Sequence, residues 1–452
     1  MSPSRTVLLH LSDIHFVKDK SGTRLDIDAD VRNELLIDAQ GLARDLGSVH
    51  GVVVSGDIAF AGKPEEYEIA VRWLAELANA VGCPPNRTWL TPGNHDVDWE
   101  QIDLTLELVH ERLRSIDPLR INDQLTTFLR DPNVGAALLR PLHAYRGFAG
   151  LQGCGFSAEQ PFWEQDLPLN DGSILRVRGV TSTLVSSRGD RKGLMVLGLA
   201  PATLPRRDGV EYMVLCHHPM DWFREQEELD NRLPTRARIL LFGHKHLQRL
   251  RREEDCVVLT AGAVHPFRNE RLWKPRYNWL ALRVEESADG ERQLEVKVFQ
   301  RVWSEGEQRF EPDSYHGAVS RRFTFEIAPW SGAGAAIGRG ECLTTPAQTR
   351  SDAEIVIHLA AEAVHDQAAQ REVMDAALRL AERFWRLPYH VRFRILRQLE
   401  LIESHEKTLP EEERIVRAFR RARELGKLEA LEAAVESHGD QRSENRGEAG
   451  AA

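Results

Sequence analysis

Five short apolar runs, each typical of a β-strand, end in acidic, amide or imidazole side chains. In chain order these are 6–11 with Asp13 and His15, 51–55 with Asp57, 88–90 with Asn94, His95 and Asp96, 212–215 with His217 and His218, and 239–242 with His244 and His246. Any one of these groups on its own is an ordinary polar turn. Because open α/β sheets place ligands at the carboxyl ends of their strands, five recurrences predict one shared site.

Helices are expected between the first three strands, at 28–46 and 65–81. In the second segment Ile69, Trp73 and Leu77 are four residues apart, which is the spacing of one face of a helix. Strand, helix and strand in alternation predict an α/β sheet.

The later part of the chain returns to strand-like runs after a long helical segment. Residues from about 99 to 168 are mostly helical by periodicity, and we interpret them as an insertion over the carboxyl edge of the sheet that selects the substrate. Strand-like runs then follow at 174–179, 212–215, 239–242, 257–260, 279–284 and 294–302. We expect these runs to form a second sheet facing the first.

The five polar groups resemble the signature blocks of the calcineurin-like metallophosphoesterases, which are D-x-H, G-D, G-N-H-[DE], a later His and G-H-x-H. All five blocks are present in this order, and the resemblance extends over about residues 6 to 328. It implies an α/β fold that is a four-layer αββα sandwich with a dinuclear metal centre at one edge. The domain would occupy residues 1–330.

The resemblance also implies a role for each residue of the site. Asp13, His15 and His246 would bind one metal ion, Asn94, His217 and His244 the other, and Asp57 both. Such ligands suit Mn, Fe or Zn, and a shared carboxylate holds two cations about 3.5 to 4 Å apart. His95 would not bind metal and would protonate the leaving oxygen or stabilise its charge. Asp96 and His218 would lie behind the ligands, with Asp96 orienting His95, starting a helix or facing solvent.

The expected reaction is phosphoester hydrolysis by direct attack of a metal-bridging hydroxide, without a covalent enzyme intermediate. Residues 58–62 after Asp57 lack the Asp-Arg-Gly run of protein Ser/Thr phosphatases, which favours the phosphodiesterases that act on cyclic nucleotides or nucleic acid. A phosphomonoesterase and a metal-binding scaffold protein are the alternatives. Arg249, Arg251 and Arg252 would either line a nucleic-acid path or form a solvated charged surface, and Lys245 would point away from the ligands.

A composition rich in Gly, Ala, Thr and Pro predicts a connector at 331–350, and helical patterns follow it. The segments 387–395, 417–422 and 428–431 resemble the death-like effector-associated domains of bacterial conflict systems. That resemblance implies that a helical domain at 351–438 recruits a partner protein, whereas the alternative is a domain for oligomerisation or capping. The polar residues 439–452 predict a disordered tail.

The formal net charge of −10 argues against a chain that grips nucleic acid over its whole surface. Five scattered cysteines form no C-x-x-C pair, so we interpret them as reduced, buried thiols. Neither a signal-peptide core nor a stretch of about 18 apolar residues is present, so we expect a cytoplasmic protein without a membrane segment.

Overall fold

The computed structural model divides the chain into two compact units, Met1–Gly338 and Arg339–Ala452, which we describe separately. The structure describes residues 5–18, 20–23, 26–266, 273–287, 289–314, 317–330, 384, 389–402, 418, 421–422 and 425–439. The expected connector at 331–350 and the expected tail beyond Gly439 lie outside these ranges, as does most of 351–388.

The first sheet of the N-terminal unit is mixed and has seven strands. Along the sheet the order is β12 (Arg309–Pro312), β11 (Arg292–Ser304), β10 (Arg276–Glu286), β1 (Thr6–Leu11), β2 (Val49–Val54) and β3 (Thr88–Leu90), with β13 (Arg321–Glu326) also paired to β11. Strands β1, β2 and β3 are parallel, whereas β10 pairs antiparallel with β1. The carboxyl ends of the three parallel strands therefore meet at one edge.

The second sheet is also mixed and has six strands. Its order is β4 (Phe162–Pro168), β5 (Ile174–Val180), β6 (Val210–Cys216), β7 (Ala237–Phe242), β9 (Cys256–Thr260) and β8 (Arg249–Glu253). The four central strands are parallel, and the edge strands β4 and β8 are antiparallel to their neighbours.

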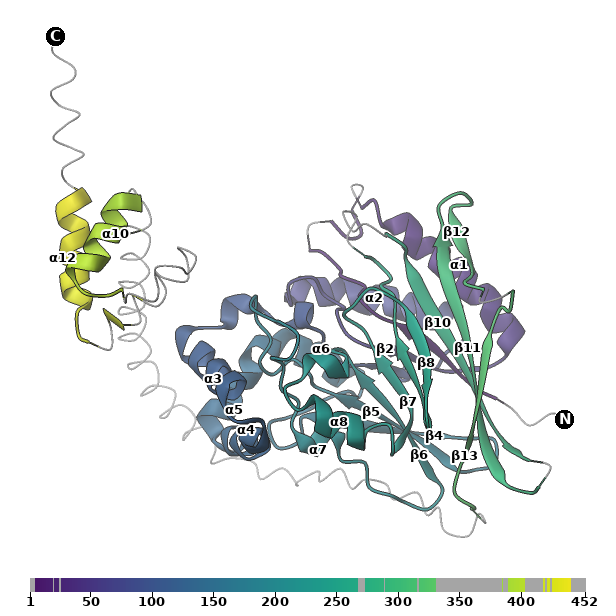
Figure 1. Ribbon diagram of the computed structural model, residues 1–452. Coiled ribbons are helices and arrows are strands. Elements are labelled where there is room, and N and C mark those ends of the chain that lie inside the picture. The colour runs from purple at the N-terminus through teal and green to yellow at the C-terminus, as the bar shows by residue number, and fades with distance from the viewer. Residues whose placement is uncertain are drawn as a thin grey trace, which may run out of the picture. The chain divides into compact units, whose positions relative to one another are not determined.

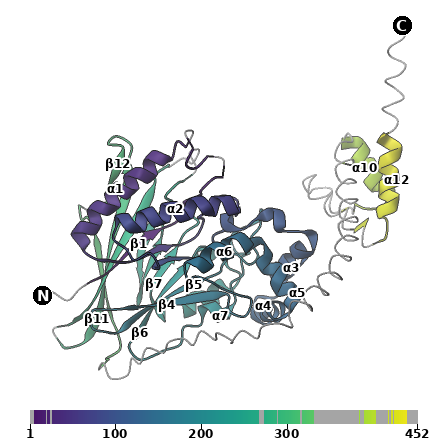
Figure 2. The same ribbon diagram turned by 180° about the vertical axis from the view of Figure 1, so that it is seen from behind.

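Helices cover both outer faces of the two sheets, which gives the predicted αββα sandwich. Helices α1 (Ala29–Leu46) and α2 (Pro64–Ala80) lie together on one side and stand in front of the strands in Figure 2, whereas α7 (Leu199–Ala202) and α8 (Gln226–Arg232) lie on the other side (Figure 1). Glu66 fixes the start of α2, because its carboxylate accepts hydrogen bonds from the Ala61 and Lys63 amides. Apolar residues of both sheets form one continuous buried core.

The segment after β3 is helical up to Leu151. It contains α3 (Leu104–Ser115), α4 (Ile121–Arg130), α5 (Pro132–Leu139) and α6 (His143–Leu151), which gather beside the carboxyl edge of the sheets (Figure 1). The helical insertion expected over about 99–168 is too long, because Phe162–Pro168 is the edge strand β4 and not a helix.

The assignment of all later strands to the second sheet was wrong for two of them. Strands β10 and β11 belong to the first sheet, where β10 pairs with β1 over Thr6 to His10. Strand order is decided by long-range pairing, which the apolar pattern of a single strand does not contain.

The described part of the C-terminal unit has a small core of its own. Helices α10 (Tyr389–Gln398) and α12 (Leu428–Gly439) contribute Ile395, Leu396, Leu431 and Val435 to it, together with buried Phe384. Among the described residues of the whole chain, none of the helices combines the length and the apolar character that crossing a membrane requires.

Candidate metal centre

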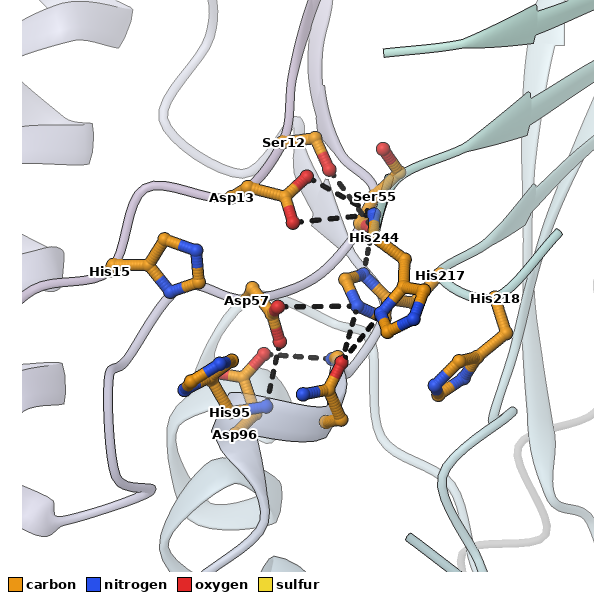
Figure 3. A network of polar contacts seen from close by, with 12 residues as sticks. Ser12, Asp13, His15, Ser55, Asp57, His95, Asp96, His217, His218 and His244 are labelled. Carbon is orange, nitrogen blue, oxygen red and sulfur yellow. Dashed lines mark hydrogen bonds and ion pairs between the residues drawn. The ribbon is translucent and has the colours of Figure 1, made fainter. Parts of the chain in front are cut away.

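The five predicted polar groups converge at the edge where parallel strands of both sheets end. Asp13, Asp57 and the loop after β3 come from the first sheet, and His217 and His244 come from the second (Figure 3). The two sheets are tied together here, because Nδ1 of His217 lies 2.9 Å from the carbonyl oxygen of Ser55. The amide of His244 also faces both carboxylate oxygens of Asp13 at 3.3 Å.

The backbone at the site is held in an unusual conformation. Seven non-glycine residues in the described ranges have positive φ, and five of them are predicted metal ligands: Asp13, His15, Asp57, His244 and His246. The left-handed region is uncommon for residues other than glycine, and strain of this kind gathers at functional sites. The loop backbone therefore takes the conformation that the directions of these five side chains require.

Three glycines leave room for the ligand side chains. A Cβ atom on Gly93 would lie 2.1 Å from Oδ1 of Asp57, and one on Gly56 would lie 2.4 Å from Nδ1 of His217. A Cβ atom on Gly243 would meet Oγ of Ser12 at 2.2 Å. Only glycine permits the loops to approach one another this closely.

The first group of donor atoms comes from Asp13, His15 and His246. Nε2 of His246 lies 3.3 Å from Oδ1 of Asp13 and 3.4 Å from Nε2 of His15. Two nitrogen ligands of one tetrahedral cation, each about 2.1 Å from it, lie about 3.4 Å apart. The spacing of these atoms therefore fits a shared cation.

The second group surrounds the side-chain oxygen of Asn94. That oxygen lies 3.0 Å from Nε2 of His217 and 2.8 Å from Nδ1 of His244. Oδ2 of Asp57 lies 3.2 Å from the same His217 nitrogen. Asp57 also forms a close group with His15 and with Asp13, so its carboxylate adjoins both sets of donors.

Both carboxylates are ionised despite their burial. Burial opposes the charged form, but His246 holds the pKa of Asp13 below its ordinary value, and His217 holds the pKa of Asp57 well below it. The same pairing acts on the imidazole, since burial opposes protonation of His217 but Asp57 raises its pKa to about 9. A cation that binds His217 must displace this proton.

Two other imidazoles are neutral. Burial lowers the pKa of His15 and of His244 to about 3. Neutral imidazoles and ionised carboxylates are the forms that coordinate metals. The donor set, the glycines and the backbone conformation thus all fit metal ions of the kind that N and O ligands bind.

His95 lies beside the predicted ligands, and one of its ring nitrogens lies within 4.8 Å of donor atoms of His15 and Asp57. Its backbone amide donates a 2.7 Å hydrogen bond to Oδ1 of Asp57, and its Nδ1 lies 2.8 Å from the carbonyl oxygen of Phe60. The His95 side chain is half-buried, so it stays accessible to a substrate.

Asp96 holds the loop after β2 and the loop after β3 together. Its carboxylate accepts hydrogen bonds from the amides of Ala59 at 2.9 Å and Gly93 at 2.9 Å, and from the hydroxyl of Tyr67 at 3.0 Å. Burial, followed by the charge of Asp57, raises the pKa of Asp96 to about 7.

His218 is fully buried beside the second donor group, with a ring nitrogen within 4.8 Å of donor atoms of His217 and His244. Its Nδ1 lies 2.9 Å from Oγ of Ser182, and its ring centroid lies 4.6 Å from that of His244. Lys245 turns to Asp221, with Nζ 2.8 Å from a carboxylate oxygen, as the sequence predicted for a residue between two ligands.

The basic run after the last block has partners within the protein. Arg251 pairs with Glu253 at 2.8 Å, and the Arg252 guanidinium lies 5.0 Å from the ring centroid of Phe325. These residues form the exposed edge strand β8, which the sequence analysis did not identify.

Sequence reasoning also missed His10 and His265, which support the ligand loops. Nε2 of His10 lies 2.9 Å from Oγ of Ser55, and Nδ1 of His265 lies 2.7 Å from the carbonyl oxygen of Ile14. The signal for His265 was its position five residues after the strand-like run 257–260, which is again a strand end.

Comparisons with known proteins were made for the sequence and for the fold. Curated proteins give no match. Solved structures with a similar fold include Vps29 from Entamoeba histolytica complexed with Zn²⁺, at 12% identity, covering 71% of this chain and 99% of that chain with a TM-score of 0.28. A conserved protein from Streptococcus pneumoniae, described as a predicted phosphoesterase, matches at 13% identity, 71% and 98% coverage and a TM-score of 0.27.

Two family models match different parts of the chain. The GTPase-associated adaptor domain matches residues 378–437, within the region that resembled death-like effector-associated domains. The calcineurin-like phosphoesterase model matches residues 6–248, which is more than half of the chain and contains every predicted ligand. The protein therefore belongs to the calcineurin-like phosphoesterase family.

Proposed function

We propose that this protein is a dinuclear metal-dependent phosphodiesterase that hydrolyses a nucleotide or a nucleic acid. The position of the Asp57 carboxylate carries the proposal, because it lies close to a donor atom of His15 in the first predicted set and of His217 in the second. A carboxylate between two sets of donors is the arrangement that a two-metal site requires.

In this proposal the donors divide into two sets joined by one shared residue. The first ion takes Asp13, His15 and His246, the second takes Asn94, His217 and His244, and Asp57 belongs to both. Manganese, iron and zinc suit such nitrogen and oxygen ligands. Two such ions, when bound, lower the pKa of water and neutralise charge on the phosphate oxygens.

His95 is proposed to act on the leaving group. A hydrogen bond from Nδ1–H to the Phe60 carbonyl requires a proton on Nδ1, so the proton delivered to the leaving oxygen is the one on Nε2. The hydrogen bond from the His95 amide to Asp57 keeps the ring beside the ligands. This residue distinguishes an enzyme from a scaffold, because a protein that only binds metal has no need of it.

The test is hydrolysis by the purified full-length protein with added Mn²⁺. The panel contains bis(p-nitrophenyl) phosphate, p-nitrophenyl phosphate, cyclic nucleotides, and single- and double-stranded DNA, with Asp57→Asn as the inactive control and Asp171→Asn as a remote acidic control. We expect turnover of diesters that is lost only in Asp57→Asn. Faster turnover of the monoester would favour the phosphomonoesterase. Equal inertness of all three proteins with metal bound would favour the scaffold.

We also propose that the helical domain recruits a partner protein by homotypic contact, as in bacterial conflict systems. Support comes from the match to an adaptor domain and from the separate core around Leu396 and Leu431. Analytical ultracentrifugation tests this with the full chain and with residues 1–338, each mixed with a protein that carries a domain of the same kind, because only the full chain is expected to sediment as a complex with it. Failure of the full chain to form a complex would contradict recruitment, and self-association of the full chain alone would favour the oligomerisation domain.

A further inference from the structure

Three rings extend outward from the ligands on the side of His95. The His95 ring centroid lies 4.8 Å from that of His15, 5.3 Å from that of Phe60 and 5.7 Å from that of Trp99. We call Phe60, His95 and Trp99 the aromatic shelf. It joins the loop after β2, the loop after β3 and the first residue of the helical insertion.

The aromatic shelf is not part of the closed core. Phe60 is 38% exposed, although it lies next to buried side chains of the candidate metal centre. Trp99 is half-buried, with one part packed against the core. Its indole Nε1–H has no hydrogen-bond partner among the residues that the structure describes, so hydrogen bonding within the protein does not explain its position.

The side chain of Arg188 lies beside the indole of Trp99. The Arg188 guanidinium lies 5.9 Å from the centroid of the Trp99 ring, and its side chain is exposed. The segment that carries Arg188 is tied to the helical insertion, because Arg114 of α3 donates to the Val185 carbonyl at 2.5 Å and to Oδ1 of Asp190 at 2.8 Å. Arg188 therefore lies in a segment that the hydrogen bonds of Arg114 hold against α3.

We propose that the aromatic shelf stacks a nucleobase of the leaving nucleoside, with Arg188 beside it. This inference rests on the proposed function, because it takes His95 as the residue that faces the leaving oxygen. A planar group next to His95 then belongs to the leaving side of the substrate. Aromatic side chains with a nearby arginine bind bases of any sequence, since every base has a π face and the arginine is attracted to it or to the backbone phosphates.

The experiment uses substrates that differ only in the base. The full-length protein with Mn²⁺ is given thymidylyl-thymidine and two analogues in which one nucleoside, on either side of the phosphate, is an abasic tetrahydrofuran. The leaving alcohols are then chemically matched. We expect wild type to prefer the substrates that keep the base on the leaving nucleoside. The ratio of kcat/KM values for the substrates with and without that base measures this preference.

Trp99→Ala is expected to reduce the preference about ten-fold, since stacking is worth about 1–3 kcal/mol per base. Trp99→Phe is expected to keep most of it, and Arg188→Gln to reduce it by a smaller factor. An equal loss of kcat/KM on all three substrates in Trp99→Ala would mean that the indole only supports His95. That result would overturn base stacking on the aromatic shelf but not the proposed function. Absence of any Asp57-dependent diester turnover would overturn the proposed function and the shelf with it.

Discussion

The backbone amide of His95 donates a 2.7 Å hydrogen bond to Oδ1 of Asp57. The residue proposed to act on the leaving group is thus fixed to the residue proposed to join two metal ions. Because the donor is a backbone group, changes of the His95 side chain leave this bond in place. Chemistry and metal binding can therefore be separated by mutation.

His95→Ala is expected to bind metal as wild type does while losing turnover. Proton transfer by a positioned side chain contributes about 10²- to 10⁴-fold, and the loss should be largest for alkoxide leaving groups, which need a proton most. Steady-state rates on thymidylyl-thymidine and on bis(p-nitrophenyl) phosphate measure the difference. An equal loss on both substrates would argue against a proton donor.

Asp96→Ala is expected to lower the free energy of unfolding by about 3 kcal/mol or more. The substitution leaves the amides of Ile58, Ala59 and Gly93 without their acceptor, and each unsatisfied buried donor costs about 1–3 kcal/mol. Tyr67→Phe removes a single hydrogen bond to the same carboxylate and should cost about 1 kcal/mol. Chemical denaturation measures both, and similar losses would contradict a clamping role.

Gly93→Ala is expected to destabilise the protein by about 3 kcal/mol and to abolish metal binding. The new Cβ would lie 2.1 Å from Oδ1 of Asp57 and 2.4 Å from its backbone nitrogen, which cannot turn away. Gly41→Ala is the matched control, because this helical glycine has nothing within 4 Å of its Cβ position. It should stabilise by about 0.5–1 kcal/mol, and thermal melts compare the two.

His110 is expected to make the protein sensitive to acid. Burial, followed by Arg114, lowers the pKa of this histidine to about 4 from an ordinary value of 6.5. Between these values the unfolded chain binds a proton that the folded chain does not, so stability falls as pH drops from 6.5 towards 4. At pH 5 the free energy of unfolding is lower by about 2 kcal/mol than at neutral pH for this reason.

His110→Leu should therefore lose less stability than wild type between pH 7 and pH 5. His143→Leu, which changes an exposed histidine of the same insertion, is the control. Denaturant midpoints at the two pH values give the comparison, and parallel curves for wild type and His110→Leu would show that folding does not lower the pKa of His110.

The residues that converge at the candidate site could be predicted from the sequence, because each lies within a few residues of an apolar strand. The role of Asp96 could not, since its partners Ile58 and Ala59 lie 38 and 37 residues away and are amides, which every residue has. The backbone strain at Asp13 and His244 has no local signature either, because it arises where two sheets meet.

The strands that escaped prediction share a physical reason. Strand β8 has the sequence Arg-Leu-Arg-Arg-Glu and is mostly exposed, as charged edge strands are. Strand β12 is short, and β13 pairs along the same outer edge of β11. Buried central strands carry an apolar pattern that identifies them, whereas edge strands are recognised by their neighbours.

Metal stoichiometry tests the central claim most directly. Metal-free protein is titrated with Mn²⁺ or Zn²⁺ by calorimetry, and bound ions are counted by mass spectrometry after gel filtration, for wild type and Asp57→Asn. Two ions per wild-type chain, with fewer and more weakly bound ions in Asp57→Asn, are expected from a carboxylate shared by both sites. One ion per chain in wild type, or two ions bound equally well by both proteins, would contradict the two-metal centre.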